Sequence, residues 1–392
     1  MDKRQIYLDN SATTRMCDES LSAYSDAARK HFGNPSSLHG IGHDAERIVS
    51  AARADILTSL YTGSGDIIFT GSGTEANNLA IIGRAHAKER FRQGAKIITS
   101  AGEHASVNAA LERLAVEGFK VAKIPTLGGE LDLDALRREL TRDTVLVTIM
   151  LVNNETGAVY NIPEVSRLIK DHAPDAYLHV DATQGYLKIP FSPQVLGADM
   201  VTVSAHKIEG PKGVGALYIS ERVKTEHGIA PIIHGGAQER GLRSGTENVP
   251  GIAAFGAAVK VGHASVKATA ESLEALKARL ISGIRSDETL SVIRIAEPVM
   301  HAPHIVNLAL PSIKSETMLH FLSSEGIYVS SGSACSSNTG HKSEALIAFG
   351  RSEAEADSSI RVSFGRENTE ADVDALLSAL RRGLERLARI RK

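Results

Sequence analysis

The chain has 392 residues, of which 42% are hydrophobic, and its formal net charge is −2. Single hydrophobic cores stop growing at about 250–300 residues, so this length predicts two domains. The nearly balanced charge argues against nucleic acid or an anionic membrane surface as the main partner.

The cysteine count and the first residues bear on the cellular compartment. Only Cys17 and Cys335 occur, which excludes a disulfide framework and a thiolate metal cluster, and we expect no metal site. The opening residues, MDKRQIYLDN, lack the apolar run of a secretory signal. No segment approaches the roughly 20 apolar residues that span a bilayer. These features predict a reduced, soluble, cytoplasmic protein.

Over the first 220 residues, short apolar runs alternate with longer helical patterns. Runs that are apolar throughout suit a sheet covered on both faces, and the alternation suits a mainly parallel α/β sheet with right-handed crossovers. The predicted strands are GDIIFT (65–70), KIITS (96–100), TVLVTIMLV (144–152), AYLHVD (176–181), DMVTVS (199–204) and GVGALYIS (213–220). The helical patterns between them are TEANNLAIIGRAHAKERF (74–91), HASVNAALERLAVEG (104–118) and IPEVSRLIKDHA (162–173).

The pattern changes from about residue 250. An alanine-rich helical region, 250–286, leads into shorter strand-like runs interleaved with helices, which suits a smaller α+β domain. We therefore predict a large domain over 15–260 and a small domain built from 1–14 together with 261–392. The strand-like runs of the small domain are LSVIRI (290–295), HIVNLAL (304–310), IYVSSGSAC (327–335) and SIRVSFG (359–365).

Ligands of open α/β sheets bind beyond the carboxyl ends of the strands, so a site is expected there. After the first predicted strand, FTGSGTEANN places Gly71, Gly73 and Thr74 between a strand and a helix. Backbone amides and the helix dipole at such a place suit one phosphate, although a plain tight turn is the alternative. The next strand end, SAGEHASV, places His104 at a helix start, where a capping or surface histidine is the alternative.

Three further strand ends carry polar side chains. VNNETG supplies Asn153 and Asn154, a residue type that also favours turns. The aspartate of HVDATQG could cap a helix or face a cationic ring nitrogen. The lysine of VSAHK has a hydroxyl and an imidazole beside it, although a strand-end lysine ordinarily points into solvent. The residues of these last two segments are Asp181, Gln184, Ser204, His206 and Lys207.

Together, these strand ends place a phosphate cradle, an aspartate, amide groups and a lysine on one rim. Pyridoxal phosphate (PLP) needs these parts: an imine-forming lysine, an acid at the pyridinium nitrogen and a phosphate pocket. Asp181 precedes Lys207 by 26 residues, about one strand–loop–strand unit, so neighbouring strands could bring them together. We therefore interpret Lys207 as the imine-forming lysine, with Ser204 and His206 as phosphate ligands.

Nine segments of the chain resemble the signature segments of cysteine desulfurases, in the class V branch of fold-type I PLP enzymes. They run in order from residue 7 to residue 366, and SSGSACSS distinguishes desulfurases from ordinary aminotransferases. Ser72 and Glu209 depart from the residues familiar in this family. The segments are YLDNSATT, FGNPSS, GTEANNLAI, VNNETG, HVDATQ, SAHKIEGPKGVGALY, RSGTEN, SSGSACSS and SIRVSFGR.

The resemblance implies a fold-type I α/β architecture and a role for each matching residue. Lys207 would carry the cofactor and remove the substrate Cα proton, while Asp181 would keep the pyridine nitrogen protonated. His104 would stack on the ring and exchange a proton with the substrate thiol. Gln184 and Asn154 would lie against the cofactor. The implied phosphate ligands are Gly73, Thr74, Ser204, His206 and, from the neighbouring subunit of a homodimer, Thr246.

The resemblance also implies a substrate site and a sulfur carrier. Asn34 of FGNPSS and Arg361 of SIRVS would bind the substrate carboxylate, Arg361 as a two-pronged donor. Cys335 lies in SSGSACSSNTGHKSEAL, whose small and polar residues suit an exposed thiolate nucleophile better than an inert core thiol. Cys17 has no such setting.

The implied reaction converts L-cysteine into L-alanine, with the sulfur passing to Cys335 as a persulfide. An acceptor protein then takes the sulfur, an iron–sulfur cluster scaffold being one candidate. Two alternatives share the fold and the cofactor: a selenocysteine lyase, and a class V aminotransferase that would not need Cys335. A non-enzymatic member would lack the lysine, the aspartate or the cysteine, and all three are present. We therefore expect a cysteine desulfurase.

Overall fold

The computed structural model describes residues 5–87, 94–311, 313–331 and 343–387. Its largest sheet has the order β2-β8-β7-β6-β5-β3-β4 among these residues. All of its strands are parallel except β8, which runs antiparallel to both β2 and β7. The strands are β2 (Asp66–Thr70), β3 (Lys96–Ser100), β4 (Lys120–Ile124), β5 (Thr144–Met150), β6 (Tyr177–Asp181), β7 (Met200–Ser204) and β8 (Gly215–Ile219).

Helices follow the strands of this sheet, as the sequence predicts. Every residue of β2, β5, β6, β7 and β8 is buried, which explains why these strands are apolar on both faces. The prediction of a mainly parallel α/β sheet is confirmed. The helices between the strands are α3 (Gly73–Ala85), α4 (Ala105–Val116), α5 (Leu133–Glu139), α6 (Ile162–His172) and α7 (Pro193–Leu196), and α8 (Glu221–Thr225) follows β8.

The strand β4 lies at the edge of the sheet and was absent from the sequence prediction. It pairs only with β3 among the described strands, in parallel register. Its Lys120 and Lys123 side chains are exposed, so KVAKI lacks the continuous apolar run of the central strands. Lysines on an edge strand also discourage pairing with another chain.

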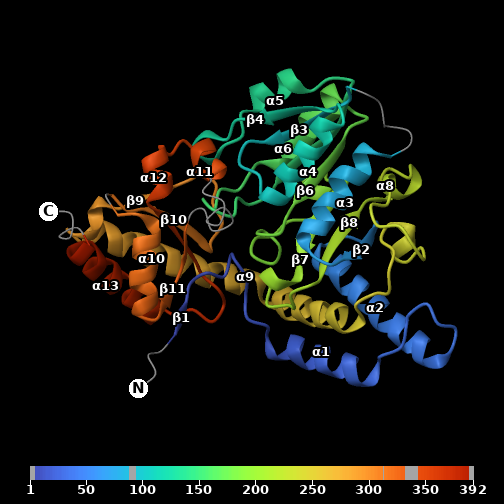
Figure 1. The fold of residues 1–392 in the computed structure, drawn as a ribbon, viewed down its shortest axis with the longest axis horizontal. Helices are drawn as coiled ribbons and strands as arrows, with labels where there is room; N and C mark the ends of the chain where they lie inside the picture. Colours follow the sequence, from blue (N-terminus) through green and yellow to red (C-terminus); the bar gives the residue numbers. More distant parts are fainter. Residues whose placement is uncertain (1–4, 88–93, 312, 332–342, 388–392) are drawn as a thin grey trace.

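The helix α9 (Val249–Ser286) joins the two parts of the molecule (Figure 1). It packs against α1 (Asp18–Lys30) and α2 (Gly40–Ser59) and reaches α13 (Glu370–Leu387). Among the described helices, it alone is long and apolar enough to cross a bilayer by length and composition, which corrects the expectation that no segment comes near this limit. Core helices of soluble proteins pass the same test, and 44% of its most apolar window is buried inside the fold.

The C-terminal elements, orange and red in Figure 1, gather on one side of the molecule. Their sheet is antiparallel in the order β12-β13-β10-β9, and β1 pairs in parallel with β11. Only part of LSVIRI is a strand, because Leu290–Val292 forms a 3-10 turn. The elements are β1 (Ile6–Tyr7), β9 (Arg294–Ile295), β10 (Ile305–Ala309), α10 (Ser315–Ser324), β11 (Ile327–Tyr328), β12 (Ser330–Ser331), α11 (Glu344–Ala348), α12 (Glu353–Asp357) and β13 (Ser359–Ser363).

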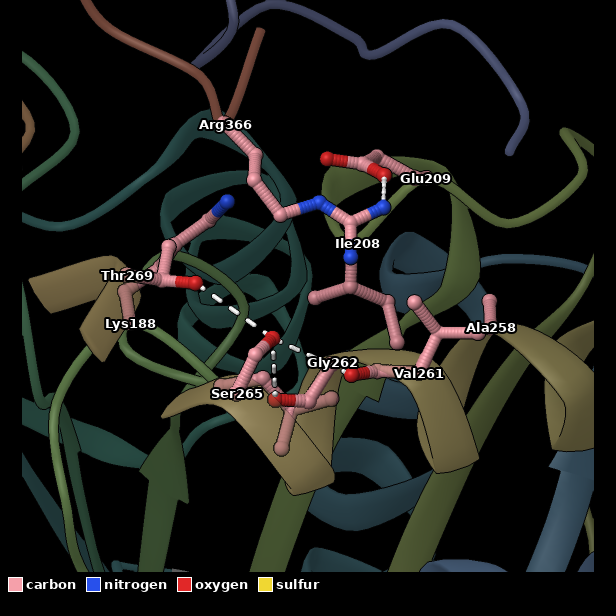
Figure 2. A pocket seen from close by; sticks show the side chains of 10 residues that line it. Lys188, Ile208, Glu209, Ala258, Val261, Gly262, Ser265, Thr269 and Arg366 are labelled. Atoms are coloured by element: carbon pink, nitrogen blue, oxygen red, sulfur yellow. Dashed lines mark hydrogen bonds and ion pairs between the residues drawn. The ribbon is translucent and has the colours of Figure 1, made fainter. Parts of the chain in front are cut away.

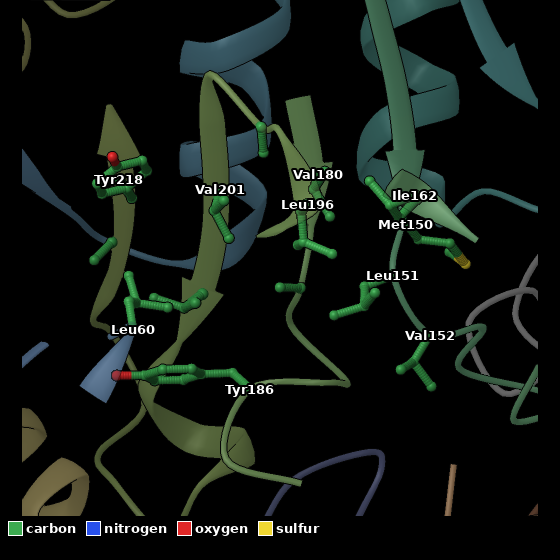
Figure 3. Packing of buried hydrophobic residues seen from close by; sticks show 14 of the residues in the cluster. Leu60, Met150, Leu151, Val152, Ile162, Val180, Tyr186, Leu196, Val201 and Tyr218 are labelled. Carbon is green, nitrogen blue, oxygen red and sulfur yellow. The ribbon is translucent and has the colours of Figure 1, made fainter. Parts of the chain in front are cut away.

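The buried apolar residues fall into separate clusters. One fills the space under the large sheet and includes Leu60, Val180, Tyr186 and Val201 (Figure 3). Another unites Leu8 with residues of the 273–384 region, so the first residues of the chain pack with its last third. The division at 260/261 stays a prediction, and α9 runs through that point without a break.

Candidate active site

A cavity of about 730 Å³ opens where three neighbouring strands of the large sheet end. Met150, Asp181 and Ser204, the last residues of β5, β6 and β7, all line it. The N-terminal ends of α3 and α4 also line it, through Gly73 and Ala105. The carboxyl end of a parallel sheet is where ligands bind in this class of fold, and the volume suits a small cofactor.

Ten of the predicted site residues line this one cavity. Asn34 and Thr246 do not; both side chains are exposed, and the Asn34 Oδ1 accepts a hydrogen bond from the Ser36 backbone N–H. Cys335 lies outside the described residues. The ten are Gly73, Thr74, His104, Asn154, Asp181, Gln184, Ser204, His206, Lys207 and Arg361.

Lys207 enters the cavity from the 3-10 turn Ala205–Lys207 that follows β7. Its Nζ donates hydrogen bonds to the backbone carbonyls of Ser11 and Ala12, at 2.5 and 2.8 Å. The amide of Gln184 donates to the same Ser11 carbonyl at 2.9 Å. The N-terminal segment therefore holds the Lys207 amine near the carboxyl end of β7.

Asp181 is 6% exposed and has a fixed orientation. One carboxylate oxygen accepts from Asn77 Nδ2 at 2.8 Å, and the other accepts from the Thr183 N–H at 2.9 Å. Below it, the His179 ring is hydrogen bonded to Thr148 and Thr202, and burial lowers the pKa of this histidine to about 4. Because His179 is neutral, no cation on β6 competes with a cationic ligand group for the Asp181 carboxylate.

The end of the cavity near β7 and α3 contains a buried hydroxyl group that could still form hydrogen bonds. The Ser204 Oγ is buried and has no hydrogen-bond partner in the described residues. A Cβ at Gly73 would lie 3.3 Å from both the Ser204 Cβ and the Thr183 Oγ1, so only glycine leaves this space open. Burial, with Lys207 and Lys212 nearby, lowers the pKa of His206 to about 4.

His104 caps α4, and its Nδ1 accepts a hydrogen bond from the Ser106 N–H at 3.2 Å. Burial lowers the pKa of His104, so the ring is neutral near pH 7. The adjacent Glu103 is fully buried, and burial raises the pKa of its carboxyl to about 8. Its Oε1 accepts from the Ser100 hydroxyl and from the Met150 N–H at 3.0 Å.

Arg361, on β13, reaches the cavity from the other side and is 5% exposed. Its guanidinium donates to the Asn154 carbonyl and to the Asp9 carboxylate, both at 2.9 Å. Glu155 is nearby and accepts from the Ser343 hydroxyl at 2.5 Å, and burial raises the pKa of Glu155 to about 7.

Five residues that hold this arrangement together were not singled out in the sequence. Asp9 and Ser11 lie in YLDNSATT, Asn77 in GTEANNLAI and Glu155 in VNNETG, so these motifs carried the signal. Glu103 precedes His104 in SAGEHASV, and a lone glutamate there gave no sign of its burial.

A second, much smaller pocket lies beside Ile208 and Glu209, which follow Lys207 (Figure 2). Its volume of about 20 Å³ holds roughly one water molecule. Lys188 lines it, and burial lowers the pKa of that amine. Figure 2 shows Arg366 reaching over the pocket to pair with Glu209. This pocket is too small for a cofactor and lies outside the main cavity.

Known proteins match the chain over nearly its whole length. The "Aminotransferase class-V" family matches residues 6–376. The curated "Cysteine desulfurase IscS 1" of Archaeoglobus fulgidus is 38% identical over 382 residues, covering 97% of either chain. A solved "NIFS-LIKE PROTEIN" superposes with a TM-score of 0.89 at 35% identity, covering 97% of this chain and all of its own. A structure described as "SspA in complex with cysteine" superposes with a TM-score of 0.78 at 30% identity. The match covers 92% of this chain and 98% of that chain.

The chain therefore belongs to the class V aminotransferase family, whose members depend on PLP. The side chains that line the cavity also fit that cofactor, independently of the family match. It offers a buried carboxylate at Asp181 for a cationic ring nitrogen, an amine at Lys207 and, near Gly73, an unpartnered Ser204 hydroxyl for an anion. The buried Oδ1 of Asn77 and Oγ of Ser11 also lack hydrogen-bond partners among the described residues. They give the same indication, since buried polar atoms ordinarily have partners.

Proposed function

We propose that this chain is a PLP-dependent cysteine desulfurase that converts L-cysteine into L-alanine and delivers the sulfur to Cys335 as a persulfide. The observation that carries the proposal is the meeting of Lys207, Asp181 and Arg361 in one cavity. Their chemistry supplies an amine, an acid for a pyridine nitrogen and a binder for an amino acid carboxylate. Relatives that carry the name cysteine desulfurase support the choice of reaction.

The cofactor would be held by side chains on three sides of the cavity. Asp181 would keep the pyridine nitrogen protonated, and His104 would stack against the ring. When bound, PLP supplies an electron sink that makes the substrate Cα–H acidic. Gln184 would contact the ring hydroxyl, and Asn154 would lie beside the cofactor. The phosphate ligands are Gly73, Thr74, Ser204 and His206, together with Thr246 of the neighbouring subunit.

Lys207 removes the Cα proton of the substrate and returns it at the end of the reaction. The carbonyls of Ser11 and Ala12, which accept from its Nζ, stabilise the protonated amine between these two events. His104 is suited to take the proton of the substrate thiol, because burial lowers its pKa and leaves the ring neutral.

Arg361 binds the substrate carboxylate, and the resemblance assigns Asn34 to the same role. Arg361 reaches the cavity from its own chain, whereas Asn34 is exposed and outside the cavity. With the carboxylate held, the substrate sulfur is presented to the Cys335 thiolate. Attack of the thiolate on that sulfur forms the S–S bond as the C–S bond breaks. The electron pair of the C–S bond passes to the substrate Cβ, whose protonation leaves alanine.

The wider setting is also part of the proposal. A homodimer brings Thr246 to the partner's phosphate site. Thr246 is exposed and does not line the cavity of its own chain, which supports this role. The protein acts in the cytoplasm and passes sulfur to an acceptor protein, with an iron–sulfur scaffold as one candidate. The chain is organised as a large domain over 15–260 and a small domain from 1–14 and 261–392.

The test is to incubate the holoenzyme with L-cysteine and a reductant and to quantify alanine and sulfide. Equal yields are expected from the native chain, and neither from Cys335→Ser, whose cofactor absorbance should be unchanged. Cys17→Ser is the matched control, because Cys17 immediately precedes α1 and does not line the cavity, and this variant should behave as the native chain. Turnover that survives Cys335→Ser would instead indicate a class V aminotransferase, and a strong preference for selenocysteine would indicate a selenocysteine lyase.

A further inference from the structure

The segment from Asp9 to Ala12 crosses between the two sheets at the cavity. In Figure 1 the N-terminal strand β1 lies with the C-terminal elements, and the chain then runs toward α1 beside α9. Asp9 forms a parallel bridge with Ser363, the last residue of β13. The Ser11 N–H donates to the Ser363 Oγ at 2.9 Å, so this segment is anchored on the strand that carries Arg361.

One end of the segment holds the arginine. The Asp9 carboxylate pairs with Arg361 Nη2 at 2.9 Å, and the side chains are 19% and 6% exposed. The other terminal nitrogen of the arginine, Nη1, donates to the Asn154 carbonyl at 2.9 Å. These two contacts fix the plane of the guanidinium, and a fixed plane is what two-pronged binding of a carboxylate requires.

The other end of the segment holds the lysine. The carbonyls of Ser11 and Ala12 accept from Lys207 Nζ, at 2.5 and 2.8 Å. A continuous stretch of four residues therefore contacts both the group expected to bind the substrate carboxylate and the group expected to react at its amino end.

We propose that Asp9 is a positioning residue that orients Arg361 for the carboxylate of an amino acid substrate, on a segment that also sets the place of Lys207. The inference rests on the proposed function for the identity of the substrate. Asp9 touches neither substrate nor cofactor in this role. It acts through the guanidinium, which lines the cavity and whose Nε has no hydrogen-bond partner among the described residues.

The test compares two probes, 3-mercaptopropionate and 3-mercaptopropionamide, which differ only in having a charged carboxylate or a neutral amide at one end. Both lack the amino group and cannot react as substrates. Their dissociation constants are measured calorimetrically on the holoenzyme. The native protein is expected to prefer the carboxylate at least tenfold, as a charge-assisted two-pronged contact would give. In Asp9→Asn, which keeps the size of the side chain, the preference should fall to about threefold or less.

The ratio of the two constants separates positioning from general loosening, since damage to the fold weakens both probes alike. Asp374→Asn is the matched control, because Asp374 forms an Asp–Arg pair with Arg279, at 2.8 Å, on the exposed surface. That variant should keep the native ratio. An unchanged ratio in Asp9→Asn would overturn the proposal, and so would an increased ratio, which would mean that Asp9 competes with the carboxylate.

Arg361→Ala distinguishes failure of this inference from failure of the proposed function. The ratio should fall to about one in that variant if Arg361 is the carboxylate binder. A ratio that drops in Arg361→Ala but stays native in Asp9→Asn rejects only the positioning role. Absence of alanine from L-cysteine with the native enzyme rejects the desulfurase, while the probe ratios still report on Asp9.

Discussion

At the scale of single residues, the cavity contains a carboxyl group that the fold keeps away from water. Glu103 is fully buried, its Oε2 has no partner among the described residues, and Asp181 adds a repulsive negative charge. Together these effects raise the pKa of Glu103 from 4.5 to about 8, with burial the largest cause. The side chain is therefore a neutral acid at pH 7, and it packs beside the Met150 backbone at the end of β5.

This raised pKa predicts that Glu103 makes the protein less stable as the pH rises. The unfolded chain loses this proton near pH 4.5, whereas the folded chain keeps it to about pH 8. Unfolding thus releases a proton within that window, and the free energy of unfolding falls as the pH rises through it. Glu103→Gln keeps an acceptor for Ser100 and Met150 but cannot ionise, so it should flatten this decline by a few kcal/mol.

Urea unfolding of the holoenzyme at pH 5.5 and at pH 8 measures the effect. Glu271→Gln, on the exposed face of α9, is the control and should decline as the native protein does. If Glu103→Gln and the native protein lost stability equally between the two pH values, the raised pKa of Glu103 would be wrong.

At the scale of elements, the sequence predicted what local patterns determine. Continuous apolar runs predicted β5 and β7, because both faces of those strands are covered. It did not predict β4, whose lysines reflect an edge position that only the assembled sheet defines. Likewise, strand ends predicted Asp181 and Lys207, whereas the pairing of Asp9 with Arg361 joins positions too distant in the chain for any local pattern.

The turn after Lys207 shows how an unusual residue is held in place. Glu209 departs from the residues familiar in the family and adopts a left-handed backbone, with φ of 64°. Its N–H donates to Thr14 Oγ1 at 2.7 Å, and its carboxylate pairs with Arg366 (Figure 2). Contacts with both ends of the chain therefore offset the strain of this turn.

This balance predicts different costs for two substitutions at Glu209. Both Glu209→Ala and Glu209→Gly remove the ion pair, but alanine also retains the steric cost of a positive φ. Glycine does not, so Glu209→Gly should be more stable than Glu209→Ala by about 1 kcal/mol. Chemical unfolding of both holoenzymes measures the difference. Equal stabilities, or a more stable alanine variant, would show that this backbone conformation is not retained.

At the scale of the whole molecule, the exposed position of Thr246 is the feature that one chain does not explain. RSGTEN matches a family segment, yet Thr246 is exposed and does not line the cavity of its own chain. Leu21 in α1, and Phe32 and Leu38 between α1 and α2, are exposed as well. Exposed apolar side chains become buried where a contact surface between subunits covers them. A second copy of the chain would account for both features.

Shared sites in a homodimer predict complementation between two defective variants. In the proposed homodimer, Lys207→Ala would remove the reactive amine of its own site and Thr246→Ala would remove a phosphate ligand from the partner's site, so each variant homodimer should be nearly inactive. In a mixed dimer, one site carries both defects and the other carries neither. Random exchange of subunits makes about half of the dimers mixed, so about a quarter of all sites regain native function.

The measurement is alanine production from L-cysteine after the two variants are mixed, exchanged under mild denaturant and reassembled. Recovery near a quarter of the native rate is expected, together with a dimer mass in sedimentation. If Thr246 served its own chain, every site in the mixed dimer would carry one defect and no activity would return. Full native activity in Thr246→Ala alone would remove Thr246 from the site altogether. Only exchange of subunits across a shared interface produces activity from two inactive parents.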